Sequence, residues 1–79
     1  MNVNEAVAKR VAELLDMKKM TSYKLAKNGG LWYGTLTGVM GKRNKNVTLA
    51  TIIQLARGFD ISVSEFLNSP LFADSNFEF

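Results

Sequence analysis

The sequence predicts one all-α domain made of five short helices. Apolar residues recur every three or four positions, residues that cap helix N-termini precede these segments, and glycines follow them. Connections are short, with no repeat, low-complexity tract or interdomain linker. Because 79 residues leave no room for a second domain, the helices must pack around one small core.

The first helix is expected over residues 4–17, with Asn2 or Asn4 as its N-cap. An apolar stripe runs along one side, formed by Val3, Val7, Val11, Leu14 and Leu15. Charged residues lie largely opposite this stripe, namely Lys9, Arg10 and Glu13.

A second, short helix is expected from Thr21 or Ser22 to Lys27. Residues 28–30, Asn-Gly-Gly, end it, because glycine adopts the left-handed conformation without a Cβ clash. The third helix is expected over residues 32–40.

Thr48 is expected to cap the fourth helix, which Gly58 ends. Its apolar positions at helical spacing are Leu49, Ile52, Ile53 and Ala56. Residues 62–65, Ser-Val-Ser-Glu, have capping-box form and predict a last helix through Leu67. We therefore expect a domain over residues 1–69 and a short apolar tail over residues 70–79.

Composition narrows the function classes. The chain contains neither cysteine nor histidine, which excludes thiolate and imidazole metal ligands, disulfides and nucleophile–histidine pairs. We expect no enzymatic activity, no metal and no cofactor, and no small-molecule effector is evident.

Glu5 and Glu13 interrupt the apolar residues of the N-terminus, so we expect neither a signal peptide nor a membrane span. We therefore expect a cytoplasmic, nucleoid-associated protein.

The charges are unevenly distributed along the chain. No acid occurs between Met17 and Phe59, and this stretch holds eight of the ten basic residues: Lys18, Lys19, Lys24, Lys27, Lys42, Arg43, Lys45 and Arg57. A positive surface of this kind favours a polyanion such as nucleic acid, with a membrane surface as the alternative. For Lys18 and Lys19 alone, a role in surface solubility is favoured.

The spacing of Ala26, Gly30 and Leu36 predicts a helix-turn-helix. Two helices that cross steeply need a small residue where they approach, a glycine in the turn and an apolar residue that closes the contact. Leu25 and Leu31 add core contacts, and Leu31, Leu36 and Val39 are expected to point inward.

The order of residues resembles the Cro/repressor-type (XRE, lambda-repressor-like) helix-turn-helix family over roughly residues 6–68. The matching positions are Leu25-Ala26, Gly30, Leu31, Leu36, Val39, Gly41-Lys42, Thr48-Leu49, Ile52-Ile53, Leu55-Ala56 and residues 61–66. The resemblance implies a compact five-helix DNA-binding domain whose third helix enters the major groove.

Carried onto this chain, the resemblance implies two sets of DNA contacts. Base or groove contacts would come from Trp32, Tyr33, Thr35 and Thr37. Phosphate contacts would come from Ser22, Lys42, Arg43, Asn44, Lys45, Asn46 and Thr48, in keeping with the anion preference of helix N-termini and of cationic loops.

The chain departs from the family pattern at three positions. Ser22 stands where many members have glutamine, and Trp32 replaces the usual serine or threonine cap of the recognition helix. Met40 replaces a common acid that pairs with an arginine of the first helix, so Arg10 is expected to lack this partner.

The third helix has few strong base-reading groups. It contains no arginine, glutamine or asparagine, and its threonines can offer methyl groups to thymine and hydroxyls to several base edges. Gly34 and Gly38 are expected on its outer face, where each costs about 1 kcal/mol relative to alanine. Either they are tolerated drift or their bare backbone lets the helix sit deeper in the groove.

Trp32 and Tyr33 at the start of the third helix are candidates for contact with DNA. Trp32 could stack on a sugar or base or cover the turn and pack on the second helix, and packing is favoured. Tyr33 is the better candidate for contact with DNA.

Four apolar residues near the C-terminus allow two interpretations: Phe66, Leu67, Leu71 and Phe72. They either fold back over the domain or join two protomers, and we expect a homodimer.

The sequence thus favours a bacterial or phage transcriptional regulator, with repression as the expected sign, that binds specific double-stranded DNA. The alternative is a protein-interaction module, such as an antitoxin or adaptor, on the same fold with weakened base readout.

Overall fold

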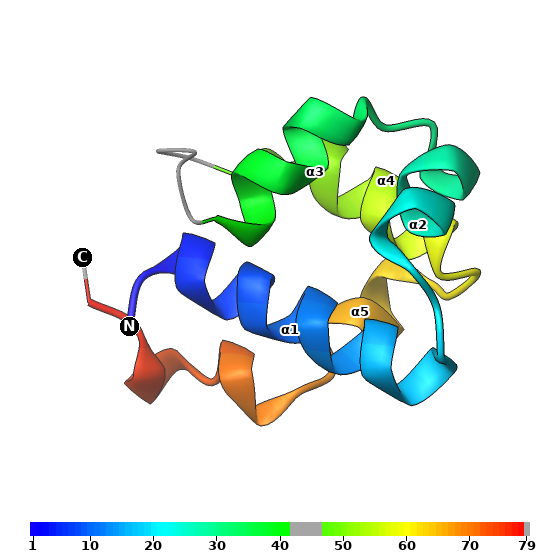
Figure 1. Cartoon of the computed structure of the whole chain (residues 1–79). Coiled ribbons are helices and arrows are strands. Elements are labelled where there is room, and N and C mark those ends of the chain that lie inside the picture. The colour runs from blue at the N-terminus through cyan, green and yellow to red at the C-terminus, as the bar shows by residue number, and fades with distance from the viewer. Residues whose placement is uncertain (42–46, 79) are drawn as a thin grey trace.

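The structure, a computed structural model, describes residues 1–41 and 47–78. The described residues form five α-helices and two 3₁₀ turns: α1 (Val3–Lys18), α2 (Ser22–Gly29), α3 (Tyr33–Met40), α4 (Leu49–Gly58), α5 (Val63–Leu67), η1 (Pro70–Phe72) and η2 (Asp74–Asn76). In Figure 1, α1 crosses the middle of the molecule, with α2, α3 and α4 on one side and the two turns on the other. The predicted all-α, five-helix fold is confirmed.

Side-chain caps start four of the five helices. Asn2 rather than Asn4 caps α1, and its side chain accepts from the Glu5 amide at 2.8 Å while the Glu5 carboxylate accepts from the Asn2 amide at 3.4 Å. Polar side chains cap the next three in the same way: Thr21 on α2, Thr48 on α4 and Ser62 on α5. Only α3 begins without a side-chain cap, directly after Trp32.

The core is built from one side of each helix. Its largest fully buried side chains are Phe59, Phe66, Leu25, Leu36, Leu55, Val7, Val11 and Val39. Two residues of the stripe predicted for α4 do not join it, since Leu49 is 66% exposed and Ile53 40% exposed. The other two predicted residues, Ile52 and Ala56, are buried as expected, and Leu55 joins them, so α4 keeps Leu49 and Ile53 as an apolar edge on the surface.

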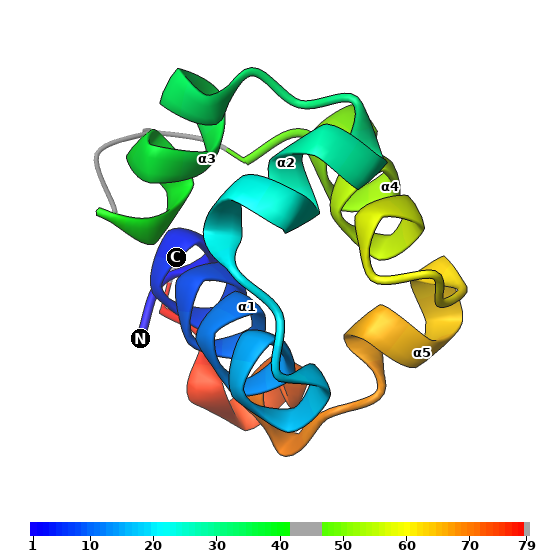
Figure 2. The ribbon, with the colours of Figure 1, turned by 45° about the vertical axis from the view of Figure 1, so that its right-hand side comes forward.

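Two glycines allow α2 and α4 to approach closely, as Figure 2 shows. A Cβ on Gly58 would lie 2.7 Å from the carbonyl oxygen of Leu25 and 3.2 Å from the amide nitrogen of Gly29. A Cβ on Gly29 would collide with the carbonyl oxygen of Gln54. The prediction that α4 ends at Gly58 is confirmed, since Gly58 is its last helical residue. The left-handed residue beyond the helix is Asp60, with φ 58°, so glycine is required at position 58 by the close approach to α2.

Arg10 joins α1 to α5. Its side chain is buried, and its guanidinium donates to the carbonyl oxygens of Phe66 at 2.7 Å and of Glu65 at 2.8 Å. It also pairs with Glu13 on its own helix. The sequence placed Arg10 on the outer side, and this expectation was wrong. Arg10 does lack an acid at Met40, as expected, and backbone carbonyls and Glu13 take the place of that partner.

The C-terminal residues fold back over α1. The Phe72 ring lies 6.2 Å from that of the buried Phe66 and 6.5 Å from that of Phe77, measured between centroids. The N-terminal ammonium donates to the carbonyl oxygen of Asn76 at 2.7 Å, which joins the two ends. Of the two interpretations of this segment, the structure shows the fold-back for Phe66 and Phe72, whereas Leu67 stays 40% exposed.

Within residues 1–41 and 47–78, none of the helices has the length and apolar character needed to cross a membrane.

Replacing Gly58 by alanine is expected to lower the free energy of unfolding by about 1–3 kcal/mol, because the new Cβ forces α2 and α4 apart. The matched control is Gly34→Ala, where nothing lies within 4 Å of the added Cβ. That change should raise the free energy of unfolding by roughly 0.5–1 kcal/mol, through helix propensity. Urea unfolding monitored by circular dichroism measures both, and equal effects would contradict the close approach.

Replacing Arg10 by methionine is expected to lower the free energy of unfolding by about 2–3 kcal/mol, since two buried carbonyl oxygens are then left without a charged donor. Glu13→Gln should cost less than about 1 kcal/mol, because the Glu13 side chain is 45% exposed. The same urea titrations separate the two variants. A destabilisation by Glu13→Gln as large as that by Arg10→Met would show that the ion pair, not the tie to α5, carries the stability.

Candidate nucleic-acid interface

The turn between α2 and α3 fixes the direction in which α3 leaves. Gly30 takes the left-handed conformation with φ 68°, and the amide of Leu31 donates to the carbonyl oxygen of Ala26 at 2.9 Å. From α4, the Gln54 side-chain amide reaches the carbonyl oxygen of Gly30 at 3.4 Å. The turn is thus bonded to both helices that support it.

The inner side of α3 packs as the sequence predicted. Leu36 is fully buried and Val39 is 2% exposed, both within the core. Leu31, just before the helix, is partly buried against the same core. These contacts leave the opposite side of α3 toward solvent, on the side of the molecule away from η1 and η2 (Figure 1).

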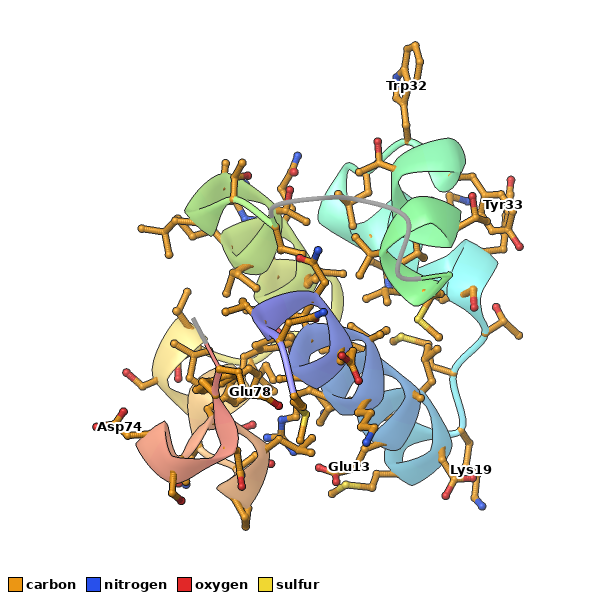
Figure 3. All side chains as sticks on the ribbon, turned by 90° about the vertical axis from the view of Figure 1, so that its left-hand side faces the viewer. Glu13, Lys19, Trp32, Tyr33, Asp74 and Glu78 are labelled. Carbon is orange, nitrogen blue, oxygen red and sulfur yellow. The ribbon has the colours of Figure 1, made fainter. Side chains whose placement is uncertain are left out.

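The start of α3 carries the most exposed of the predicted groove residues. Trp32 is 84% exposed and Tyr33 52% exposed, and Figure 3 shows Trp32 projecting away from the body of the protein. The prediction that Trp32 packs over the turn was therefore wrong: its extended backbone, with φ −63° and ψ 135°, directs the indole outward.

The two threonines of α3 are less accessible than Trp32 and Tyr33. Thr35 and Thr37 are both half-buried. The Thr37 hydroxyl donates to the carbonyl oxygen of Gly34 at 2.9 Å, within its own helix. Its hydrogen is thereby engaged, so the threonine contributes its methyl group more readily than a donor.

The two glycines predicted on the outer face of α3 differ. Gly34 is exposed, with nothing within 4 Å of the position where a Cβ would stand. Gly38 is buried, so its predicted outward position was wrong. Since Gly38 is separated from Gly34 by slightly more than one turn and adjoins the buried Val39, it falls toward the core side.

Two of the predicted phosphate-binding residues, Ser22 and Thr48, lie at helix starts. Ser22 is the first residue of α2 and half-buried, while Thr21, not Ser22, caps that helix by accepting from the Lys24 amide at 3.1 Å. Thr48 is exposed and caps α4, accepting from the Thr51 amide at 3.2 Å. The others lie outside the described residues: Lys42, Arg43, Asn44, Lys45 and Asn46.

Three of the seven acids lie far from the start of α3. Figure 3 shows Glu13, Asp74 and Glu78 at the opposite end from Trp32 and Tyr33. Across residues 1–41 and 47–78, the ion pairs are those of Glu13 with Arg10 and of Glu78 with the N-terminus. The basic residues of the acid-free stretch that can be placed are therefore not neutralised by carboxylates: Lys18, Lys19, Lys24, Lys27 and Arg57.

Tyr23 belongs to this surface, although the sequence did not predict it as a site residue. Tyr23 on α2 is 69% exposed, and its ring centroid lies 6.4 Å from that of Tyr33 at an interplanar angle of 52°. The pair joins the start of α2 to the start of α3. Its only signal in the sequence was an aromatic residue directly after the Ser22 position, and the pairing depends on the turn geometry.

The described residues hold no group of three or more acids, cysteines or histidines that could bind a metal ion. The chemistry available on this surface is thus that of cations, hydroxyls, aromatic rings and helix N-termini.

Comparison with known proteins identifies the fold independently. A profile of the Cro/C1-type HTH DNA-binding domain matches residues 10–70. The control protein C.SmaI of Serratia marcescens is 31% identical over 67 residues, which cover 85% of this chain and 79% of that protein. No solved structure matches. With the helix-turn-helix at α2 and α3 and a family match over most of its length, the chain belongs to the Cro/C1-type helix-turn-helix DNA-binding family.

Proposed function

We propose that the chain is a transcriptional regulator that binds specific double-stranded DNA with α3 in the major groove. The observation that carries this proposal is the exposed side of α3, which lies away from the C-terminal turns and beside α2, whose Lys24 and Lys27 form no ion pair within the described residues. An α-helix is about 10–12 Å across and the major groove about 12 Å wide, so α3 fits.

In this arrangement, base contacts come from the start of α3 and phosphate contacts from its surroundings. Trp32 and Tyr33 face the base edges, and Thr35 and Thr37 add methyl groups beside them. The amides at the start of α2 and of α4 favour phosphate, which assigns Ser22 and Thr48 to the backbone of the duplex. Lys42, Arg43 and Lys45, which lie outside the described residues, are assigned to the same backbone by their charge.

A homodimer accounts for the apolar edge that α4 leaves on the surface. Leu49 and Ile53 are exposed one turn apart, and a hollow of about 500 Å³ beside Ile53 continues to Ile61 and Val63. A protomer measures 32 by 23 by 20 Å. The α3 helices of a dimeric helix-turn-helix protein lie about one turn of B-DNA apart, roughly 34 Å, a separation of the same order as the long dimension of one protomer.

Two further points support a regulatory role. The relative from Serratia marcescens is named a control protein, which fits a DNA-binding regulator of transcription. A dimer that occupies about one turn or more of duplex blocks other proteins from the same site, and on this ground we propose repression as its action.

The purified chain is expected to bind random duplex DNA at low salt, with log affinity falling linearly against log salt by about 0.9 per phosphate contacted. Replacing Lys42, Arg43 and Lys45 by glutamine should weaken binding to all sequences alike and reduce that slope by roughly 0.9 for each phosphate that the variant no longer neutralises. Fluorescence anisotropy with a labelled duplex measures both.

The matched control is the pair Lys42→Arg and Lys45→Arg, which keeps the charge and should keep the slope. Selection of bound duplexes from a random pool should enrich a palindrome. No binding at low salt, together with a stable complex with another protein, would contradict the proposal and support the interaction-module alternative.

Replacing Ile53 by aspartate is expected to convert the dimer to a monomer, because two copies of the charge would meet across the symmetric contact. Affinity for a palindromic duplex should fall by at least tenfold, while affinity for a single half-site stays unchanged. Sedimentation equilibrium reports the mass, and Ser75→Asp, which adds the same charge at an exposed position of η2 away from α4, is the control. A wild-type protein that is monomeric at all concentrations would refute the α4 contact.

A further inference from the structure

We propose that Trp32, Tyr33 and Tyr23 form an apolar reading edge that recognises the C5-methyl groups of thymine in the major groove. This inference rests on the proposed function and adds to it the class of base sequence that the protein prefers. It gives Tyr23 and Trp32 a role in the choice of base sequence, which the helix-turn-helix fold by itself does not assign to them.

The first step is the chemistry that α3 lacks. No arginine, lysine, asparagine or glutamine occurs from Trp32 to Met40, so α3 itself cannot make the bidentate hydrogen bonds that read guanine or adenine. The Thr37 hydroxyl donates to its own helix. What remains at the exposed start of α3 is apolar area with few donors.

The second step is the amount and placement of that area. Trp32 is 84%, Tyr23 69% and Tyr33 52% exposed, and all three stand at or beside the entry of α3. Large aromatic side chains gain most from burial, so three of them at the surface indicate a partner. The neighbouring Gly34 adds no side chain that would hold them off that partner.

The third step is the choice of occupant. Cations that no carboxylate neutralises within the described residues flank the aromatic edge on α2, namely Lys24 and Lys27. That charge complements the phosphates on either side of a groove. Among the base edges in the major groove, thymine alone carries a methyl group, so an apolar edge placed there discriminates in favour of thymine.

The fourth step is rigidity, which discrimination requires. The tilted contact between the rings of Tyr23 and Tyr33, 6.4 Å between centroids, ties the first turn of α3 to that of α2. The Gly30 turn fixes the same two helices from the other end of α2. The Tyr33 ring therefore meets the groove in one orientation rather than as a free side chain.

The test compares two duplex polymers, alternating poly(dA-dT) and alternating poly(dA-dU), which have the same hydrogen-bonding groups and charge but differ in the thymine methyl. The full-length protein is expected to bind the thymine polymer more tightly, by roughly fourfold for each methyl buried. Trp32 is the single tryptophan of the chain, so its fluorescence reports directly on the reading edge. The thymine polymer should protect it from acrylamide quenching.

Three variants assign the effect to residues. Trp32→Ala and Tyr33→Ser should abolish most of the preference for thymine while leaving the salt dependence of binding unchanged. Tyr33→Phe retains the ring and should retain the preference. Because Trp32 is so exposed, Trp32→Ala should unfold at the same urea concentration as the wild type, which separates a reading role from a folding role.

Equal affinity for the two polymers, or a preference that survives Trp32→Ala, would overturn the inference and leave the proposed function intact. Failure to bind either polymer at low salt would defeat the proposed function itself. Protection of Trp32 by vesicles containing anionic phosphatidylglycerol, without protection by either duplex, would overturn the inference in favour of a membrane surface.

Discussion

The contact between α2 and α4 is the constraint on which the rest of the structure depends. Gly29 and Gly58 bring the two backbones so close that a single Cβ would separate them. With α2 held at that distance, the turn at Gly30 is bonded on one side to α2 and on the other to Gln54 of α4. The direction of α3 follows from this turn, because α3 has little else to orient it beyond the burial of Leu36 and Val39.

A second contact, from Arg10 of α1 to α5, determines where the C-terminal residues lie. Arg10 crosses from α1 to the last carbonyls of α5, in a position where an unpaired guanidinium would be costly to bury. It thereby fixes the point from which the C-terminal residues turn back along α1. Those residues carry Asp74 and Glu78 to the side away from Trp32 and Tyr33 (Figure 3).

The recognition helix is unusual in chemistry rather than in position. It lacks a side-chain cap, which leaves the amides at its start without a protein acceptor from a capping side chain, and it carries rings and methyl groups where amides or guanidinium groups are the stronger readers. If α3 enters the groove as we propose, affinity comes mainly from phosphate contacts, which are common to all sequences. Discrimination among sequences then depends on shape and apolar contact, which demand a rigid start of α3.

The sequence by itself determined the helices, their caps and the helix-turn-helix, because these depend on neighbours a few residues apart. Thr48, Ser62 and Gly30 act where their residue types predict. Only the tertiary structure decided which way exposed or buried side chains point. From the sequence, Arg10 is expected on the surface, but α5 supplies acceptors that hold it in the interior. Gly58 is expected only to end a helix, but its backbone also lies against Leu25. Trp32 is expected to pack on the protein, but the turn directs its side chain outward. The burial of a side chain depends on residues far along the chain, and no local sequence pattern contains them.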